Sequence, residues 1–405
     1  MLYILIAIVL ISYGLSKVLD WLNNKNWSDT VPAELEGIID AEKYKRSQEY
    51  HKEKEKLGNV SGVLSTATML VLLYTGFFGW YDGFTENINA NPIWHTLLFF
   101  GILGLASDLL SMPFQLYNTF KIEEKYGFNK STVKLFFMDK IKGYLLGGLI
   151  GGALMALFVW FYQQTGTNFW LWMWIAVSGF TIIMAMFYTS LILPIFNKLK
   201  PLEESSLRTA IETYAAKVGF QLNNIFVMDG SKRSAKANAF FSGLGKKKKI
   251  VLYDTLIEKH TEDELVSILA HEVGHYKKKH TLLGIAMSVV TTGITLFILS
   301  LLINNGALTE ALGGTDVSFR LGLLAFGILY SPVSTITGLI ANAVSRKNEF
   351  EADNYAKTTY SGEALQSALK RLSVDHLSNL QPHPAFVFFH YSHPPLLQRL
   401  KALAA

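Results

Sequence analysis

The sequence His271-Glu272-Val273-Gly274-His275 has the residue types and the spacing of a hydrolytic metal site. Residues four apart share one face of a helix, so His271 and His275 can offer ring nitrogens to a single ion. Glu272 lies beside the first histidine, within reach of a water at the metal, where it can act as a general base. The sequence contains no cysteine, which excludes thiolate ligands and disulfides. The motif therefore predicts one zinc ion per chain and metal-assisted hydrolysis.

The residues before this motif predict the helix that must carry it. Thr261 and Glu264 have the spacing of a capping box, which marks a helix start. Leu265, Ile268 and Leu269 then form an apolar stripe that continues through the motif at helical spacing. The polar groups of the motif should therefore face inward, where an unpaired charge is costly and a metal would compensate it.

Two histidines leave a catalytic zinc ion short of a third protein ligand. We expect this ligand between Ser345 and Asp353, which two further membrane crossings return to the same side of the membrane. Glu349 and Asp353 share a helical face, and Glu351 points away from both. We assign Glu349 as the ligand, because its longer side chain reaches further. Asp353 can accept the other N–H of a ligating histidine. The alternative interpretation is that the charged residues between Ser345 and Asp353 form an ordinary solvated cluster just beyond a membrane span.

The C-terminal residues offer groups that could stabilise a developing oxyanion. His383, His390 and His393 cannot be told apart as candidates from the sequence alone, and Arg399 follows six residues after the last of them.

Bulk apolarity is the second strong signal, since half of the 405 residues are hydrophobic. Seven segments approach or exceed the roughly 20 apolar residues that a membrane-spanning helix needs. They are residues 2–20, 60–82, 93–117, 141–163, 169–196, 281–304 and 319–344. The first has no basic flank or convincing cleavage site, so we expect a retained anchor and not a signal peptide.

Basic residues alternate between the connections of these segments, with Arg320 as a boundary exception. Connections such as Lys121 to Lys142 are rich in lysine, whereas residues 82–92, 163–168 and 304–318 have no lysine or arginine. This pattern predicts an external N-terminus and a cytoplasmic C-terminus. Cytoplasmic loops facing anionic lipid account for the net charge of +5, so no nucleic-acid partner is expected.

The chain divides into a membrane region over residues 1–196 and a peptidase region over residues 197–405, which includes the last two spans. Within residues 197–280 we expect a helix over 202–218 and short strands over 224–229, 237–241 and 250–254. Glycines between Gly143 and Gly152 suggest close helix packing. Asp108, inside the third span, has either a functional or a structural role.

Together these residues resemble the type I CAAX prenyl proteases, which are integral-membrane zinc peptidases. The resemblance covers most of the chain, in order. Besides the two motifs above, it includes Pro113 to Lys130, Pro194 to Asn197 followed by Pro201-Leu202, Asn238 to Phe241, and Ser392-His393-Pro394-Pro395 with Arg399.

The resemblance implies a mainly α fold, with seven transmembrane helices around an intramembrane chamber and a small α+β peptidase domain. It implies that His271, His275 and Glu349 bind zinc, that Glu272 is the catalytic base, and that Asp353 supports the ligands. His393 and Arg399 would lie near the substrate. Asn238 would lie on an edge strand that pairs with the substrate backbone.

Members of this family remove three C-terminal residues from prenylated proteins, so the resemblance implies a peptide or protein substrate bound beside membrane lipid. The chain length and the lack of a retention signal favour a bacterial inner membrane over the endoplasmic reticulum. The sequence leaves two alternative functions open. One is a quality-control protease of the HtpX type, and the other is a non-catalytic membrane scaffold or transporter.

Overall fold

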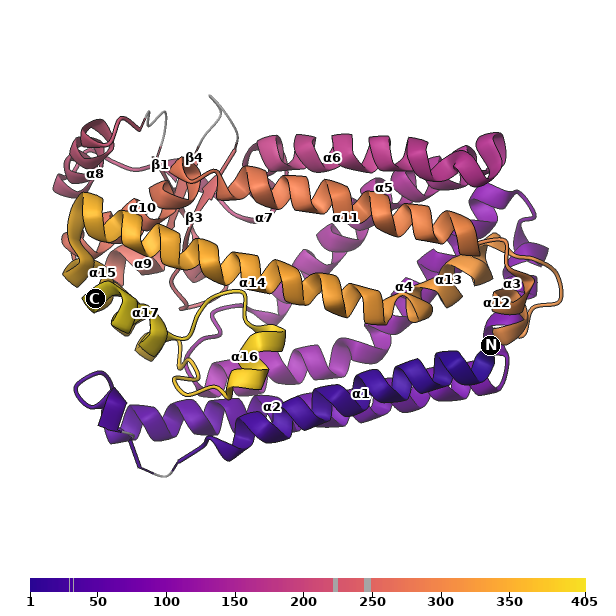
Figure 1. Cartoon of the computed structure of the whole chain (residues 1–405), viewed down its shortest axis with the longest axis horizontal. Helices are drawn as coiled ribbons and strands as arrows, with labels where there is room; N and C mark the ends of the chain where they lie inside the picture. The colour runs from indigo at the N-terminus through magenta and orange to yellow at the C-terminus, as the bar shows by residue number, and fades with distance from the viewer. Residues whose placement is uncertain (29, 32, 221–224, 244–248) are drawn as a thin grey trace.

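Long helices run along the whole molecule and place the two termini at opposite ends (Figure 1). The computed structural model describes residues 1–28, 30–31, 33–220, 225–243 and 249–405. The predicted strand start at Asn224 and most of the lysine run before Ile250 fall outside the described residues. The remaining chain forms a helical body that carries a small sheet at one end.

The long helices follow the apolar segments of the sequence. They are α1 (Leu2–Lys25), α2 (Ala41–Tyr74), α4 (Pro92–Tyr117), α5 (Val133–Thr165), α6 (Phe169–Leu191), α11 (His280–Leu302), and α13 (Phe319–Leu329) with α14 (Ser331–Ala356). Among the described residues, five continuous stretches are long and apolar enough to cross a membrane, or six with the pair α13 and α14, which is bent by 51°. One of the five, residues 133–196, holds both α5 and α6, which pack together across the turn Gly166–Asn168. Each of the seven predicted segments thus overlaps a helix, although 60–82 runs past the end of α2 into α3 (Phe77–Ile88) and 319–344 is bent between α13 and α14.

Short helices close the end of the molecule that lies away from the sheet. They are α3 (Phe77–Ile88) and α12 (Gly306–Ala311), which pack near the start of α13. Arg320, the basic residue that interrupts the alternation of charge, donates two hydrogen bonds to the buried carboxylate of Asp82. A paired charge avoids the cost of an isolated one at this depth, which explains the exception.

The sheet lies at the other end of the molecule and has the order β1-β2-β4-β3. Its strands are β1 (Leu199–Pro201), β2 (Ile225–Met228), β3 (Ala239–Ser242) and β4 (Lys249–Tyr253). β3 pairs antiparallel with β4 and forms one edge of the sheet. Helices α8 (Ser206–Lys217), α9 (Asp254–Lys259) and α10 (Glu262–Lys277) complete this end together with α15 (Gly362–Asp375), α16 (Pro384–His390) and α17 (Leu396–Ala404).

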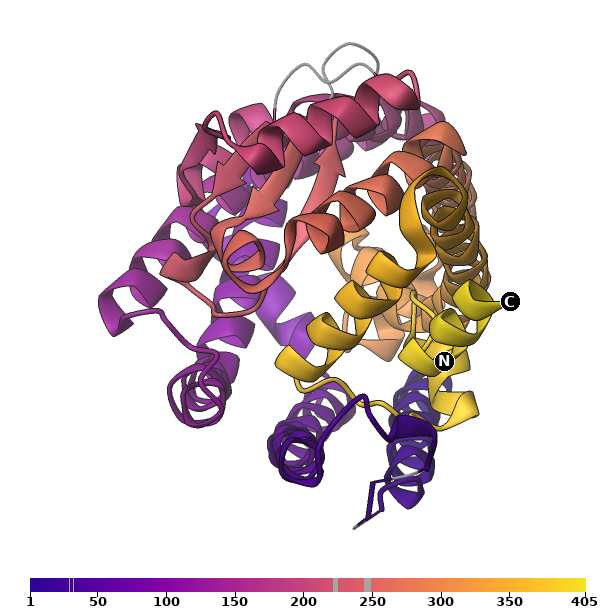
Figure 2. The same cartoon turned by 90° about the vertical axis from the view of Figure 1, so that its left-hand side faces the viewer.

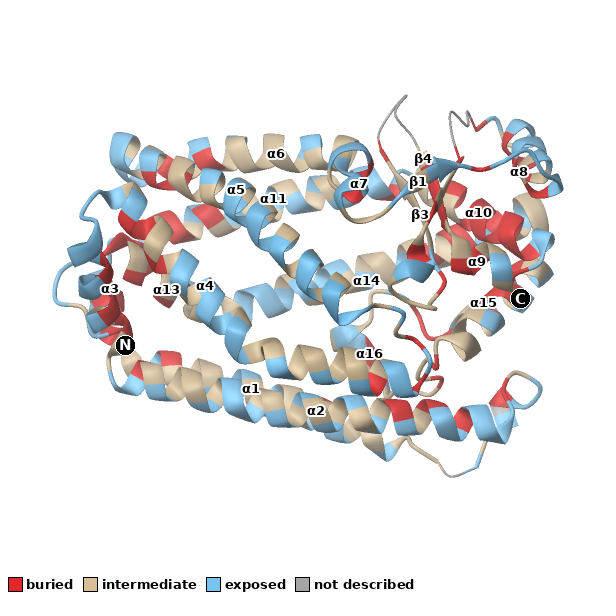
Figure 3. Cartoon of the chain, turned by 180° about the vertical axis from the view of Figure 1, so that it is seen from behind, coloured by how far each residue is buried: buried red, intermediate tan, exposed pale blue. Residues whose placement is uncertain are grey.

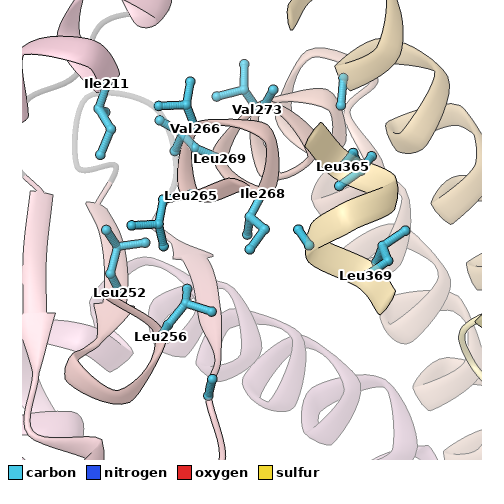
Figure 4. Close-up of a cluster of buried hydrophobic side chains, with 14 of the residues drawn as sticks. Ile211, Leu252, Leu256, Leu265, Val266, Ile268, Leu269, Val273, Leu365 and Leu369 are labelled. Atoms are coloured by element: carbon cyan, nitrogen blue, oxygen red, sulfur yellow. The ribbon is translucent and has the colours of Figure 1, made fainter. Parts of the chain in front are cut away.

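The best-packed core of the molecule lies around α10, between the sheet and α15. Figure 4 shows Leu265, Ile268 and Leu269 of α10 among side chains of the sheet and of Leu365 and Leu369 on α15. Buried residues concentrate at this end and at the opposite end, whereas the long helices between them expose many of their side chains (Figure 3). The apolar stripe predicted for this helix therefore does anchor it in a core.

The structure tests two predictions about the membrane helices, the close packing of the α5 glycines and the role of Asp108. A Cβ atom added to Gly143, Gly147, Gly148 or Gly151 would meet nothing within 4 Å among the described residues, so the predicted close packing of these glycines is wrong. Asp108 forms an ion pair with Lys140 of α5 and accepts a hydrogen bond from Gln115 at 3.1 Å. This pairing favours a structural role for Asp108, joining α4 to α5.

Candidate metal centre

Helix α10 begins where the capping box predicts. Thr261 Oγ1 accepts the N–H of Glu264 at 3.3 Å, and Glu264 Oε2 accepts the N–H of Thr261 at 3.0 Å. The Glu264 carboxylate also accepts a hydrogen bond from Ser367 on α15 at 2.6 Å, which ties the start of the motif helix to its neighbour. These contacts fix the start of the helix that carries the two histidines.

Two helices distant in sequence bring three donor atoms together. His271 and His275 lie on α10, and Glu349 lies on α14, which packs along it. One ligand atom from each of these residues lies within 4.8 Å of the other two, so the three can hold one metal ion. The sequence placed Glu349 in this set, and the fold brings it to both histidines.

The separations of the three donors fit a tetrahedral ion. The two histidine Nε2 atoms are 3.0 Å apart. Glu349 lies 3.2 Å from His275 Nε2 through Oε1, and 3.5 Å from His271 Nε2 through Oε2. Zinc bonds of about 2.0–2.1 Å would separate tetrahedral ligands by roughly 3.3 Å. Glu349 Oε2 is also buried without a hydrogen-bond partner among the described residues, as expected of an atom that binds a metal.

Asp353 and Arg399 form a second layer behind His271. Asp353 Oδ1 lies 2.9 Å from His271 Nδ1. Arg399 donates to both oxygens of Asp353, at 2.8 and 2.6 Å, and its Nη1 lies 3.4 Å from Glu349. Burial alone would disfavour the imidazolium, but the carboxylates of Asp353 at 2.9 Å and Glu349 at 3.5 Å outweigh it and raise the pKa of His271 to about 9. The Arg399 guanidinium is therefore engaged by two carboxylates, Asp353 and Glu349, and holds both in place.

A matching layer behind His275 has no counterpart in the sequence analysis. His275 Nδ1 lies 3.0 Å from His280 Nδ1, and His280 Nε2 lies 3.3 Å from Glu351 Oε2. Helical spacing placed Glu351 away from Glu349, and His280 belongs to no motif of the sequence. The available signal was that His280 begins the helix directly after α10, where it can turn back toward the motif.

Glu272 occupies the position expected of a base. Its carboxyl group lies beside the two histidines and receives a hydrogen bond from the backbone of Phe241 on β3. Burial, and then the charge of Glu349, raise the pKa of Glu272 above its ordinary value, although the histidines oppose this. A carboxyl group with a raised pKa is better matched to proton transfer near neutral pH.

The other candidate groups separate clearly in space. His393 Nε2 lies 3.4 Å from Glu349 Oε1, and His393 lines the cavity at the metal centre. In contrast, His383 caps α16 by accepting the N–H of Ala385, and the ring of His390 contacts that of Phe386 in a tilted arrangement. The fold therefore distinguishes three histidines that the sequence could not.

Asn238 lies directly before β3 and not within it, one residue outside the predicted strand position. Its carbonyl accepts the N–H of Tyr253, which holds it against β4. Asn238 and the β3 residues Ala239, Phe240 and Phe241 line the same cavity as the metal centre. The edge of β3 that does not pair with β4 thus faces the metal site.

The cavity has a volume of about 1020 Å³ and extends away from the sheet between the long helices. Its walls include small and polar residues of α11 and α14, among them Gly284, Ser288, Thr292, Ser334 and Gly338. Figure 2 shows the helices arranged around this region when the molecule is viewed from the sheet end. A peptide bond at the metal centre could therefore lie in a space that reaches between the membrane helices.

Comparison with known proteins agrees with this geometry. Residues 20–198 match the family model described as CAAX prenyl protease N-terminal, five membrane helices, and residues 201–405 match the model of peptidase family M48. The chain is 38% identical over 386 residues to a CAAX prenyl protease 1 homolog of Oryza sativa, covering 92% of this chain and 90% of that protein. It is 34% identical to CAAX prenyl protease 1 of Saccharomyces cerevisiae, with coverage of 92% and 88%.

A solved structure shows the same fold over the whole chain. The crystal structure of S. mikatae Ste24p superimposes with a TM-score of 0.94 at 31% sequence identity, covering 100% of this chain and 99% of the other.

The chain belongs to the CAAX prenyl protease family of M48 metallopeptidases. It is a membrane metalloendopeptidase, and the resemblance seen in its motifs is confirmed. Membership of a metallopeptidase family agrees with the three possible metal ligands His271, His275 and Glu349.

Proposed function

We propose that this protein is a zinc endopeptidase that removes the three C-terminal residues of prenylated membrane-bound proteins. The observation that carries the proposal is the meeting of His271, His275 and Glu349 beside the free edge of β3, at a cavity that opens between membrane helices. The names of the relatives supply the substrate class.

Each group has a defined task in this proposal. Two histidines and one carboxylate match a catalytic zinc site, and the bound ion would supply Lewis acidity toward a water and a peptide carbonyl. Glu272 takes a proton from the attacking water and returns it to the leaving nitrogen. His393 is exposed toward the cavity and donates to the oxygen of the scissile carbonyl. The free edge of β3 holds the peptide backbone extended.

We further propose that the peptidase end faces the cytoplasm and that the N-terminus lies outside, because the basic connections gather at the sheet end. The bacterial inner membrane remains our prediction from the sequence. The relatives described above come from eukaryotes.

Exchange of Glu272 for Gln tests the chemistry. This variant keeps the shape of the side chain and the three metal ligands, so zinc content should stay at one ion per chain. Peptide cleavage should fall by about 10²–10⁴-fold, the usual contribution of a general base. Elemental analysis and hydrolysis of a farnesylated peptide measure the two quantities. Full activity of Glu272→Gln would remove the proposed base, and a wild-type protein without metal would favour a scaffold.

A second comparison tests the substrate class. The proposed function predicts faster cleavage of a farnesylated peptide than of the same peptide without the prenyl group. A quality-control protease would cleave both alike.

A further inference from the structure

A second cavity adjoins the metal-centre cavity and is not used by the chemistry described so far. Its volume is about 1010 Å³. The two cavities share one wall, formed by Leu369, Leu372, His376, His393 and Arg399. The second cavity therefore lies directly beside the metal-centre cavity.

The second cavity contains a cationic group of residues around Glu123. Lys236 Nζ and Lys54 Nζ each lie 3.3 Å from a different oxygen of Glu123. Tyr50 donates its hydroxyl proton to the same carboxylate and accepts a hydrogen bond from Lys236 at 3.0 Å. Two ammonium groups thus share one carboxylate, which leaves one positive charge unmatched.

Among the described residues, the other cations of this cavity are already engaged, whereas the Glu55 carboxylate has only a neutral partner. Lys17 lies 2.9 Å from Asp20, and Glu55 accepts a hydrogen bond from Asn24 at 2.6 Å. Arg399 is held by Asp353, as described above. Lys236 and Lys54 are therefore the cations of the cavity that can accept another anion, and about a third of the Lys236 side chain is exposed.

The edge strand leads from the metal centre to Lys236. A peptide paired antiparallel with β3, the commoner orientation of strand pairs, runs with its C-terminus toward the start of the strand. The start of β3 is preceded by Asn238, Ala237 and Lys236. We place the cleaved bond opposite Ala239, so that three extended residues on the leaving side, about 10 Å in length, reach back to Lys236.

A hydrogen bond fixes the chain at this point. The N–H of Ala237 donates to Nε2 of His376 at 3.0 Å. Burial, and then the charges of Lys236 and Lys259, lower the pKa of His376 to about 4, so its ring is neutral and can accept. Lys236 is therefore held beside the path of the peptide.

We propose that Lys236, assisted by Lys54, binds the terminal carboxylate of the substrate and so measures the length of the peptide beyond the cleaved bond. This inference rests on the proposed function and adds a specificity site to it. A free carboxylate three residues after the cut would meet the unmatched positive charge, whereas an internal peptide bond would not.

Two farnesylated peptides that differ only at the C-terminus, a free acid and its carboxamide, test the inference. Wild-type protein should cleave the acid about 10- to 100-fold more efficiently in kcat/KM, as expected of a hydrogen bond to a charged group. The variant Lys236→Gln should lose most of this preference, and Lys236→Arg should keep it. Each variant is measured on both peptides, so a general loss of activity cancels in the ratio.

Lys249→Gln is the matched control, because Lys249 lies opposite Ser242 at the other end of β3. It should keep the preference for the acid. If Lys249→Gln lost the preference for the acid and Lys236→Gln kept it, the peptide would run parallel to β3, and the inference would be wrong.

The remaining outcomes separate this inference from the proposed function. Cleavage of both peptides at equal rates by wild type, or an unchanged preference in Lys236→Gln, overturns the carboxylate site alone. Cleavage of neither peptide overturns the proposed function and the inference with it. If Lys236→Gln does not fold, inhibition of wild type by the leaving tripeptide decides: the acid must inhibit at least tenfold more strongly than its amide.

Discussion

The two zinc-ligand histidines we propose are supported unequally by their surroundings. His271 faces Asp353, which is itself clamped by Arg399, so its ring is held by a rigid pair of charged groups. His275 faces His280, whose partner Glu351 is more exposed. Groups that fix a ligand imidazole set its tautomer and its basicity. We infer that His271 contributes the better-organised nitrogen.

The Asp353 carboxylate should be needed for tight metal binding. Asp353→Asn keeps the shape but removes the charge that faces His271 Nδ1, so zinc affinity should fall by about 10- to 100-fold. Competition with a chromogenic chelator measures this affinity. Glu363→Gln is the control, since it makes the same change of charge at an exposed position in the first turn of α15. Equal affinities of the two variants would contradict a supporting role for Asp353.

At the scale of elements, the metal centre depends on how closely α10 approaches α14. Gly274, inside the metal motif, lies at the contact between them. A Cβ atom at this position would lie 3.1 Å from Ala352 Cα and 3.1 Å from Tyr355 Cβ. Ala352 Cα and the Ala352 carbonyl oxygen, which would lie 3.2 Å away, belong to the backbone of α14 and cannot rotate away. Close contact between α10 and α14 therefore requires glycine at position 274.

Gly274→Ala should consequently push α14 away from α10. Overpacking of this kind costs about 1–3 kcal/mol of folding free energy, and the displacement should weaken zinc binding as well, because the Glu349 donor comes from α14. Thermal unfolding and metal titration measure the two effects.

Gly284→Ala provides the control on α11. Nothing lies within 4 Å of a Cβ atom there among the described residues, and alanine favours a helix over glycine. This variant should be as stable as wild type or slightly more stable. If both alanine variants behaved alike, close contact at Gly274 would not explain the glycine.

At the scale of the whole molecule, the two ends differ in charge and in task. The sheet, the metal centre and the lysine-rich connections share one end, and α3 and α12 form the other (Figure 1). Because the long helices separate these ends, the membrane must place them in different compartments.

Single cysteines can test the orientation, since the chain has none of its own. Ala90 follows α3 at one end, and Ala216 lies on α8 at the other; both are exposed. A membrane-impermeant maleimide should label Ala90→Cys in intact cells and label Ala216→Cys only after the membrane is opened. The reverse pattern would overturn the proposed orientation.

Much of this architecture is local and therefore readable from the sequence. The capping box at Thr261 and the apolar stripe after it depend on neighbours within a few residues, and both predict α10 correctly. Long apolar runs predict membrane helices because lipid imposes a length and a composition on each span separately. Glu349 could be proposed because two crossings return the chain to the same side.

The tertiary structure alone decided which groups meet across elements. It separated His393 from His383 and His390 and brought His280 and Glu351 behind His275. It left four glycines of α5 without close neighbours among the described residues, whereas a Cβ atom at Gly152 would contact Leu97. It also placed Lys236 and Lys54, from distant segments, around one carboxylate. Periodicity fixes the face of a helix on which a side chain lies, but the partner that this face meets depends on how the helices pack, and that is a property of the whole chain.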